Sequence, residues 1–157
     1  MENTYIVIAD AHRARCFERR SEKAPLIELA DFLSPHIALT GSHLIGDLTG
    51  AAGKGHGRTG HSGAQFERHI EVPDKERGDF AQQLADYLNE AVMQRRCKSL
   101  ALIATSPMLG DLRPRLVPSA ARAVKHTVAK DLTHYTGPEL TRRVSHALGL
   151  SAYGSND

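Results

Sequence analysis

The stretch Thr4-Tyr5-Ile6-Val7-Ile8-Ala9-Asp10 decides the fold of this 157-residue chain. Its uninterrupted apolar run is typical of an interior strand that is covered on both faces of a sheet. A second such run, Ser99-Leu-Ala-Leu-Ile-Ala-Thr105, follows a long helical pattern. Because a helix followed by a strand favours a parallel crossover, we expect these two runs to be neighbouring parallel strands.

The residues on either side of the first run extend the predicted sheet. Residues 11–13 should turn, residues 14–19 alternate well enough for an antiparallel partner, and residues 26–33 form a third strand candidate. The first 33 residues therefore predict a three-strand meander. Residues 66–72 are open to two interpretations, a short strand or an extended lead-in to the helix that follows.

Helices are predicted in the second half of the chain. Apolar residues recur at helical spacing from Pro73 to about Arg95, and Ser106-Pro107 should cap a short helix. Residues 124–132 fit either a helix or a strand. Thr136-Gly-Pro-Glu139 has the pattern of a capping box, and Gly149 should end the helix that it starts. The fold class is thus α/β, with a mixed β-sheet flanked by helices.

Composition bounds the function classes. The chain is 41% hydrophobic and 24% charged, which is typical of a soluble globular protein, and its net charge of +2 does not by itself indicate a nucleic-acid partner. No apolar run approaches the ~18 residues of a membrane span, and the N-terminus lacks the pattern of an export signal. We expect a cytoplasmic protein with reduced Cys16 and Cys97, one domain over residues 1–150, a flexible tail at 151–157, and no cofactor. The sequence does not predict an oligomeric state.

A glycine-rich loop at residues 41–65 is the segment where function is expected. Eight of the thirteen glycines lie between Gly41 and Gly63, and the core of the loop reads Gly53-Lys-Gly-His-Gly-Arg-Thr-Gly-His-Ser-Gly63. Such a segment cannot build a core, and compact domains rarely keep structureless connections of this length without using them. His56 and His61 match no zinc motif, so no specific metal site is expected. A solvated loop without any ligand is the alternative interpretation.

The loop and its flanks resemble the Gly-Gly-Gln domain of archaeal and eukaryotic peptide-chain release factors. Lys54-Gly55-His56-Gly57-Arg58-Thr59-Gly60-His61-Ser62 is similar to their His-Gly-Arg-Gly-Gly-Gln-Ser loop, and it is likewise followed by a charged lead-in and a long helix. The whole chain also resembles small bacterial proteins described as required for attachment to host cells. Two signatures carry that resemblance, Ile8-Ala-Asp-Ala-His-Arg-Ala-Arg15 and Lys130-Asp-Leu-Thr133.

The release-factor resemblance implies a domain with the fold of their central domain and a role in translation. Arg58, Gly60 and Ser62 occupy the positions of the family's arginine, second glycine and serine, whereas Thr59 replaces the first glycine and His61 replaces the glutamine that helps to position water. One hypothesis is therefore an RNA or ribosome binder, with the ribosome or tRNA as partner. The residues expected to bind RNA are Lys54, Gly55, His56, Gly57, Arg58, Gly60, Ser62 and Arg68.

Two other hypotheses remain open. If the protein is an enzyme, the resemblance implies hydrolysis of the peptidyl-tRNA ester, with His61 orienting water or acting as a base. Alternatively, it is an attachment or adhesion factor that acts indirectly and binds no nucleic acid. Outside the loop, Asp10, Arg13 and Arg15 are interpreted as a structural turn with an ion pair, with a surface recognition patch as the alternative. Asp131 and His134 are interpreted as turn and cap residues before the last helix.

Overall fold

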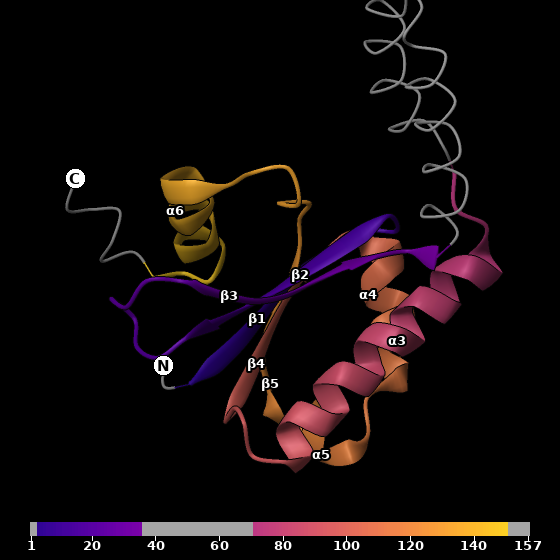
Figure 1. Ribbon diagram of the computed structural model, residues 1–157, viewed down its shortest axis with the longest axis horizontal. Helices are drawn as coiled ribbons and strands as arrows, with labels where there is room; N and C mark the ends of the chain where they lie inside the picture. The colour runs from indigo at the N-terminus through magenta and orange to yellow at the C-terminus, as the bar shows by residue number, and fades with distance from the viewer. Residues whose placement is uncertain (1–2, 36–70, 151–157) are drawn as a thin grey trace, which may run out of the picture.

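The computed structural model describes residues 3–35 and 71–150, and its α-helices and strands are labelled in Figure 1. The strands are β1 (Thr4–Ala9), β2 (Arg13–Arg19), β3 (Ile27–Leu33), β4 (Ser99–Ala104) and β5 (Val124–Ala129). The helices are α3 (Asp74–Met93), α4 (Ser106–Leu112), the 3-10 helix η1 (Arg113–Arg115), α5 (Pro118–Ala123) and α6 (Gly137–Ala147).

The strands form one mixed sheet in the order β3-β2-β1-β4-β5. β1 pairs antiparallel with β2, and β2 pairs antiparallel with β3, so the predicted meander is confirmed. β1 also pairs in parallel with β4, Thr4 opposite Ser99 and Ala9 opposite Ala104, which confirms the predicted crossover. β4 pairs in parallel with β5 at the far edge. The carboxyl ends of β1, β3, β4 and β5 therefore meet at one edge of the sheet, which is called the carboxyl edge below.

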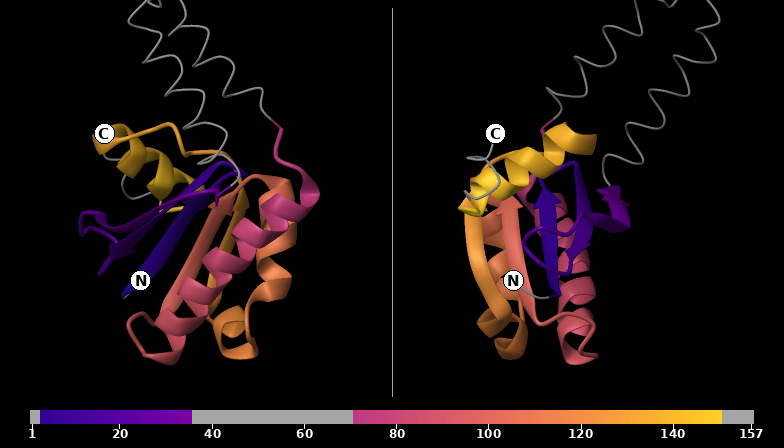
Figure 2. Two further views of the ribbon diagram at one scale, coloured as in Figure 1. Left: turned by 45° about the vertical axis from the view of Figure 1, so that its right-hand side comes forward. Right: turned by 90° about the vertical axis from the view of Figure 1, so that its left-hand side faces the viewer.

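Helices cover both faces of the sheet, as the uninterrupted apolar run of β1 predicts. Tyr5, Val7 and Ala9 pack with the apolar residues of α3, α4 and α5 on one face. Ile6 and Ile8 point to the opposite face, where they pack with the apolar residues of α6. Figure 2 shows the three layers, with α6 on one side of the strands and α3 on the other. The expected α/β class, a mixed sheet flanked by helices, is confirmed.

The carboxyl ends of α6 and α3 have the same backbone geometry. α6 ends as predicted, because Gly149 has φ +75° and its N–H donates to the His146 carbonyl, while the Leu150 N–H donates to the Ser145 carbonyl. This pair of bonds is the Schellman motif. α3 ends with the same pair of bonds, but Arg95 has the positive φ of +60° where glycine is usual.

The predicted helix starts lie within one residue of the observed ones, but the predicted capping hydrogen bonds do not form. Thr136 is the N-cap residue of α6, yet its side chain makes no capping hydrogen bond. Glu139 instead accepts hydrogen bonds from Arg142 and Arg143, so the capping box does not form. At α4 the N-cap residue is Thr105 rather than Ser106, and there too no side chain caps the helix.

Residues 113–132 are where the sequence pattern was least informative. The ambiguous segment is a strand over Val124–Ala129, and its partly buried and exposed residues alternate as expected for an edge strand. The short helices η1 and α5 were not predicted. The expected lead-in at 66–72 falls mostly outside the described residues, and residues 71–73 belong to no regular element. Among the helices that the structure describes, none has the length and apolar character needed to cross a bilayer.

Candidate functional site

The residues that the sequence marked for function lie outside the described part of the chain. These are His61 and the expected RNA-binding residues Lys54, Gly55, His56, Gly57, Arg58, Gly60, Ser62 and Arg68. The structure does describe where the chain leaves the sheet before this segment and where it returns. Both points lie at the carboxyl edge, and the polar residues there form the candidate site.

The departure point is the end of β3. Leu33 pairs with Arg13, and the backbone N–H of Ser34 donates to the carbonyl oxygen of His12 at 2.8 Å. The buried Ser34 is thereby held against the turn that follows β1. The return point is the start of α3 at Asp74. Because α3 leads into the amino end of β4, its first turn lies at the carboxyl edge, where Arg77 hydrogen-bonds Asp111 of α4.

Asp10 organises the turn after β1. Its Oδ1 accepts hydrogen bonds from the backbone N–H groups of His12 at 2.8 Å and Arg13 at 2.9 Å, an arrangement typical of an Asx turn. The expected structural turn is confirmed. The expected ion pair forms at Arg15, whose guanidinium pairs with Glu28 of β3 at 3.2 Å, whereas no arginine among the described residues pairs with Asp10. The His12 imidazole also approaches Asp10, with Nδ1 3.9 Å from Oδ1.

The loop between β5 and α6 is organised in the same way. Oδ1 of Asp131 accepts hydrogen bonds from the backbone N–H of Thr133 at 3.0 Å and from the Thr133 hydroxyl at 2.6 Å. The interpretation of Asp131 as a turn residue is therefore confirmed. His134 caps no helix, because the N-cap residue of α6 is Thr136.

The two loops are joined by three hydrogen bonds, which are called the clasp below. The Thr133 hydroxyl donates to Oδ2 of Asp10 at 3.1 Å. The Arg13 guanidinium donates to the carbonyl oxygen of Thr133, and the Arg15 guanidinium donates to the carbonyl oxygen of Tyr135 at 3.0 Å. The two sequence signatures, 8–15 and 130–133, are thus the two halves of one contact between residues about 120 positions apart.

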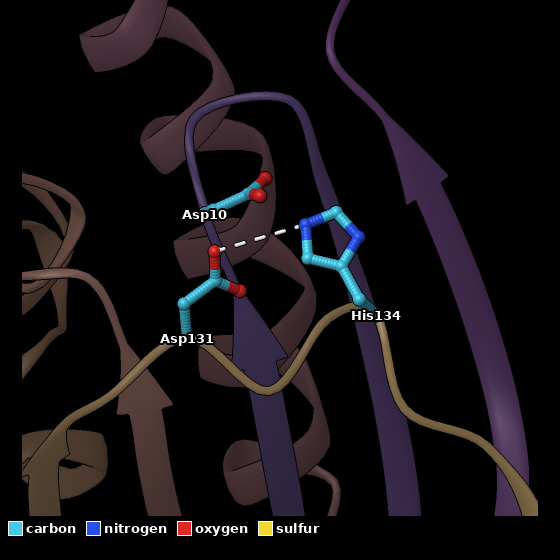
Figure 3. Close-up of side chains that lie close together, drawn as sticks. All are labelled: Asp10, Asp131 and His134. Atoms are coloured by element: carbon cyan, nitrogen blue, oxygen red, sulfur yellow. Dashed lines mark ion pairs between the residues drawn. The ribbon is translucent and has the colours of Figure 1, made fainter. Parts of the chain in front are cut away.

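Asp10, Asp131 and His134 place three possible metal ligands together (Figure 3). One oxygen or nitrogen of each lies within 4.8 Å of the others, and the Asp131 Oδ2 to His134 Nε2 distance is 3.9 Å. Zinc and manganese are bound by such a mixed set of carboxylates and imidazole. The hydrogen bonds of the two turns and of the clasp together already occupy three of the four carboxylate oxygens, however, and the Arg13 guanidinium lies beside Thr133. The arrangement is therefore accounted for as a structural junction.

Asp131 and His134 are the exposed residues of this cluster. Their side chains are 38% and 60% exposed, whereas that of Asp10 is 10% exposed. Within the described residues, the carboxylate and the imidazole are thus the groups of the cluster that a bound molecule could contact first. Spacing along the sequence could not reveal the cluster, because nothing local links Asp10 to residues 131–134.

Comparison with known proteins gives one result that bears on this chain. A family model described as "Protein required for attachment to host cells" matches residues 5–144. The match spans both halves of the clasp, all of β2 to β5, and β1 from its second residue. No curated protein matches the sequence.

Proposed function

This chain belongs to the family of proteins required for attachment to host cells, and within that family we propose that it binds RNA, in association with the ribosome, through residues 41–68. The proposal concerns the molecular activity that underlies the family's description. An attachment phenotype then follows indirectly, through the translation of other proteins.

The observation that carries the proposal is the position of the two described ends of the segment. Ser34 is held against the turn after β1, and Asp74 begins α3 at the same edge of the sheet. The clasp fixes this edge from the other side through Arg13 and Thr133. A segment that carries Lys54, Arg58 and Arg68 on a glycine-rich backbone is thus attached at both ends to one fixed edge.

The chemistry of the segment fits single-stranded or irregular RNA. Glycine allows the backbone to approach phosphates closely, and lysine and arginine neutralise them. Histidine rings stack on unpaired bases. The resemblance of residues 54–62 to the loop of the release factors also favours RNA binding, because that loop acts inside the ribosome.

The experiment is cosedimentation of the full chain with ribosomes at low and moderate salt. The test variant is Lys54→Ala/Arg58→Ala. The matched control is Lys23→Ala/Arg122→Ala, which removes the same charge from exposed positions of the described scaffold. We expect wild type and control to cosediment and the test variant to remain in the supernatant, with binding that weakens steeply as salt rises.

The same preparation separates the alternatives. Release of peptide from peptidyl-tRNA by wild type, lost in His61→Ala, would identify a hydrolase. Equal cosedimentation of the test and control variants would show that Lys54 and Arg58 do not contribute to ribosome binding. Absence of the protein from ribosomal fractions at both salt concentrations, with its recovery at the cell surface, would contradict the proposal and favour direct adhesion.

A further inference from the structure

A pocket of about 760 Å³ lies away from the clasp, between α4, η1, α5 and the edge strand β5. Its walls are of three kinds. Two cationic side chains, two hydroxyl side chains and an apolar lining contribute to it; they are Arg113 and Lys125, Ser106 and Thr127, and a set that includes Leu109 and Leu116. Pockets that hold small molecules commonly have volumes of roughly 300–1,000 Å³ and combine apolar walls with a few polar groups.

The charge of the pocket is of one sign. No acidic residue lines it among the described residues, and both cations are exposed. Arg113 and Lys125 have no ion pair with any acidic side chain in the part of the chain that the structure describes. The neighbouring Arg77 differs, because Asp111 holds its guanidinium and raises its pKa. The two cations of the pocket are therefore available to an anion.

Gly110 gives an independent indication of a ligand. It lies inside α4 and lines the pocket, and a Cβ added to it would meet nothing within 4 Å. Its φ is not positive, so neither backbone conformation nor packing requires glycine there. Alanine is favoured over glycine in a helix interior. A glycine that opens onto a cationic pocket lets a ligand approach the helix backbone closely.

We propose that this pocket binds a small phosphorylated molecule of about the size of a nucleoside monophosphate. Arg113 and Lys125 neutralise the phosphate, and the hydroxyl groups of Ser106 and Thr127 donate hydrogen bonds to its oxygens. Leu109 and Leu116 pack against the uncharged body of the ligand, which approaches α4 at Gly110. The site is separate from residues 41–68 and does not depend on their binding RNA.

The test is a titration of the full-length, ¹⁵N-labelled protein, followed by amide chemical shifts. The probes are a purine nucleoside monophosphate, its parent nucleoside, and inorganic phosphate. The pocket variants are Arg113→Gln, Lys125→Gln and Gly110→Leu. The matched control is Arg122→Gln, which removes one charge from an exposed position on α5 that does not line the pocket.

We expect saturable shifts of the amides of α4 and β5 with the monophosphate, and affinities at least about tenfold weaker with the nucleoside or with inorganic phosphate. Each cation variant should weaken monophosphate binding about tenfold or more, and Gly110→Leu should abolish it while its other amide resonances remain those of the folded protein. Arg122→Gln should bind as wild type does. An equal loss in Arg122→Gln and Lys125→Gln would reduce the effect to general charge and overturn the proposal. Shifts with a short RNA but with no mononucleotide would overturn it in favour of a polymer site.

Discussion

Thr133→Val tests whether the clasp stabilises the fold. The valine keeps the shape of the buried threonine but removes the hydroxyl that lies 3.1 Å from Oδ2 of Asp10 and 2.6 Å from Oδ1 of Asp131. One hydroxyl hydrogen serves two carboxylates, so the substitution removes one hydrogen bond to a charged acceptor. Such a bond contributes about 1.5–3 kcal/mol. We therefore expect the free energy of unfolding to fall by about 2 kcal/mol, which corresponds to about 4–8 °C in Tm for a chain of this size.

Urea denaturation measures this loss, and two further variants give it a specific interpretation. Thr141→Val is the matched control, because its hydroxyl makes only a 3.4 Å bond to a carbonyl within α6, and it should cost less than about 0.5 kcal/mol. Asp10→Asn removes the other partner. The double variant Thr133→Val/Asp10→Asn should then differ from the sum of the singles by at least about 0.5 kcal/mol. Additive losses, or a Thr133→Val loss no greater than that of the control, would refute the clasp as a stabilising contact.

Three further predictions concern the scaffold. Gly149→Ala should lower the free energy of unfolding by about 1 kcal/mol, because the φ of Gly149 is +75°. Arg95→Gly should raise it by about 0.5–1 kcal/mol, because Arg95 also has a positive φ, +60°, at the end of a helix. Urea denaturation of both variants measures these changes. Gly110→Ala should be stabilising by about 0.5–1 kcal/mol in thermal melts, since the added methyl group meets open space, and a loss of stability would mean that the position is packed. Burial raises the pKa of Cys16 to about 12 and that of Cys97 to about 11, against 9.0 for an exposed thiol, so the unfolded chain loses these protons first as the pH rises. The free energy of unfolding should therefore keep its full value below pH 9 and fall between pH 9 and 12. It should fall less in Cys16→Ala, and an identical pH profile for that variant would contradict a contribution from the buried Cys16 thiol.

The layered core was predictable because β1 and β4 carry their information locally. Residues buried on both faces of a sheet must be mostly apolar, and residues 5–9 and 100–104 meet that condition without interruption. The Schellman end of α6 was equally readable, since Gly149 is the residue type that tolerates a positive φ. These elements depend on composition within a few neighbouring residues, which is the information that a single sequence holds.

The edge strand β5 was harder to predict from the sequence, and the reason is physical. Val124 and Val128 are four residues apart, which fits a helix face, but they are also partly buried positions of an edge strand whose register shifts opposite Leu100 and Ala101. Because of this shift, the two valines lie on opposite faces of the sheet, where Val124 packs against the core beneath α3 and Val128 against the core beneath α6. No local pattern announces such an irregularity, because it arises from the pairing itself.

The clasp lies beyond local reasoning altogether. Asp10 and Asp131 each begin an ordinary polar turn, and both residues were interpreted in that way. Only the sheet order brings the turns together, because β5 lies two strands from β1 with its carboxyl end at the same edge. The predicted capping box failed for the opposite reason. Glu139 had an attractive local partner in sequence, but Arg142 and Arg143 compete for its carboxylate on the exposed face of α6.

The path of the chain explains why this sheet has an open pocket at β5. From β1 the chain continues to β2 and β3 on one side of β1, and after α3 it returns to form β4 and β5 on the other side. The direction in which strands are added to the sheet therefore reverses between β1 and β4. The segment after β4 covers the face shared with α3, whereas the segment after β5 passes to the opposite face as α6. The face of β5 next to α4 is consequently covered by little more than α5, a helix of six residues. In open α/β sheets, ligands bind near such a reversal, at the carboxyl ends of the strands. The clasp occupies this edge beside β1, whereas the pocket runs along β5 from Ser106, which begins α4 at this edge, to Val124 at the amino end of β5. Substitutions in the clasp should therefore lower stability before they change ligand binding, and substitutions at Arg113 or Lys125 should do the reverse.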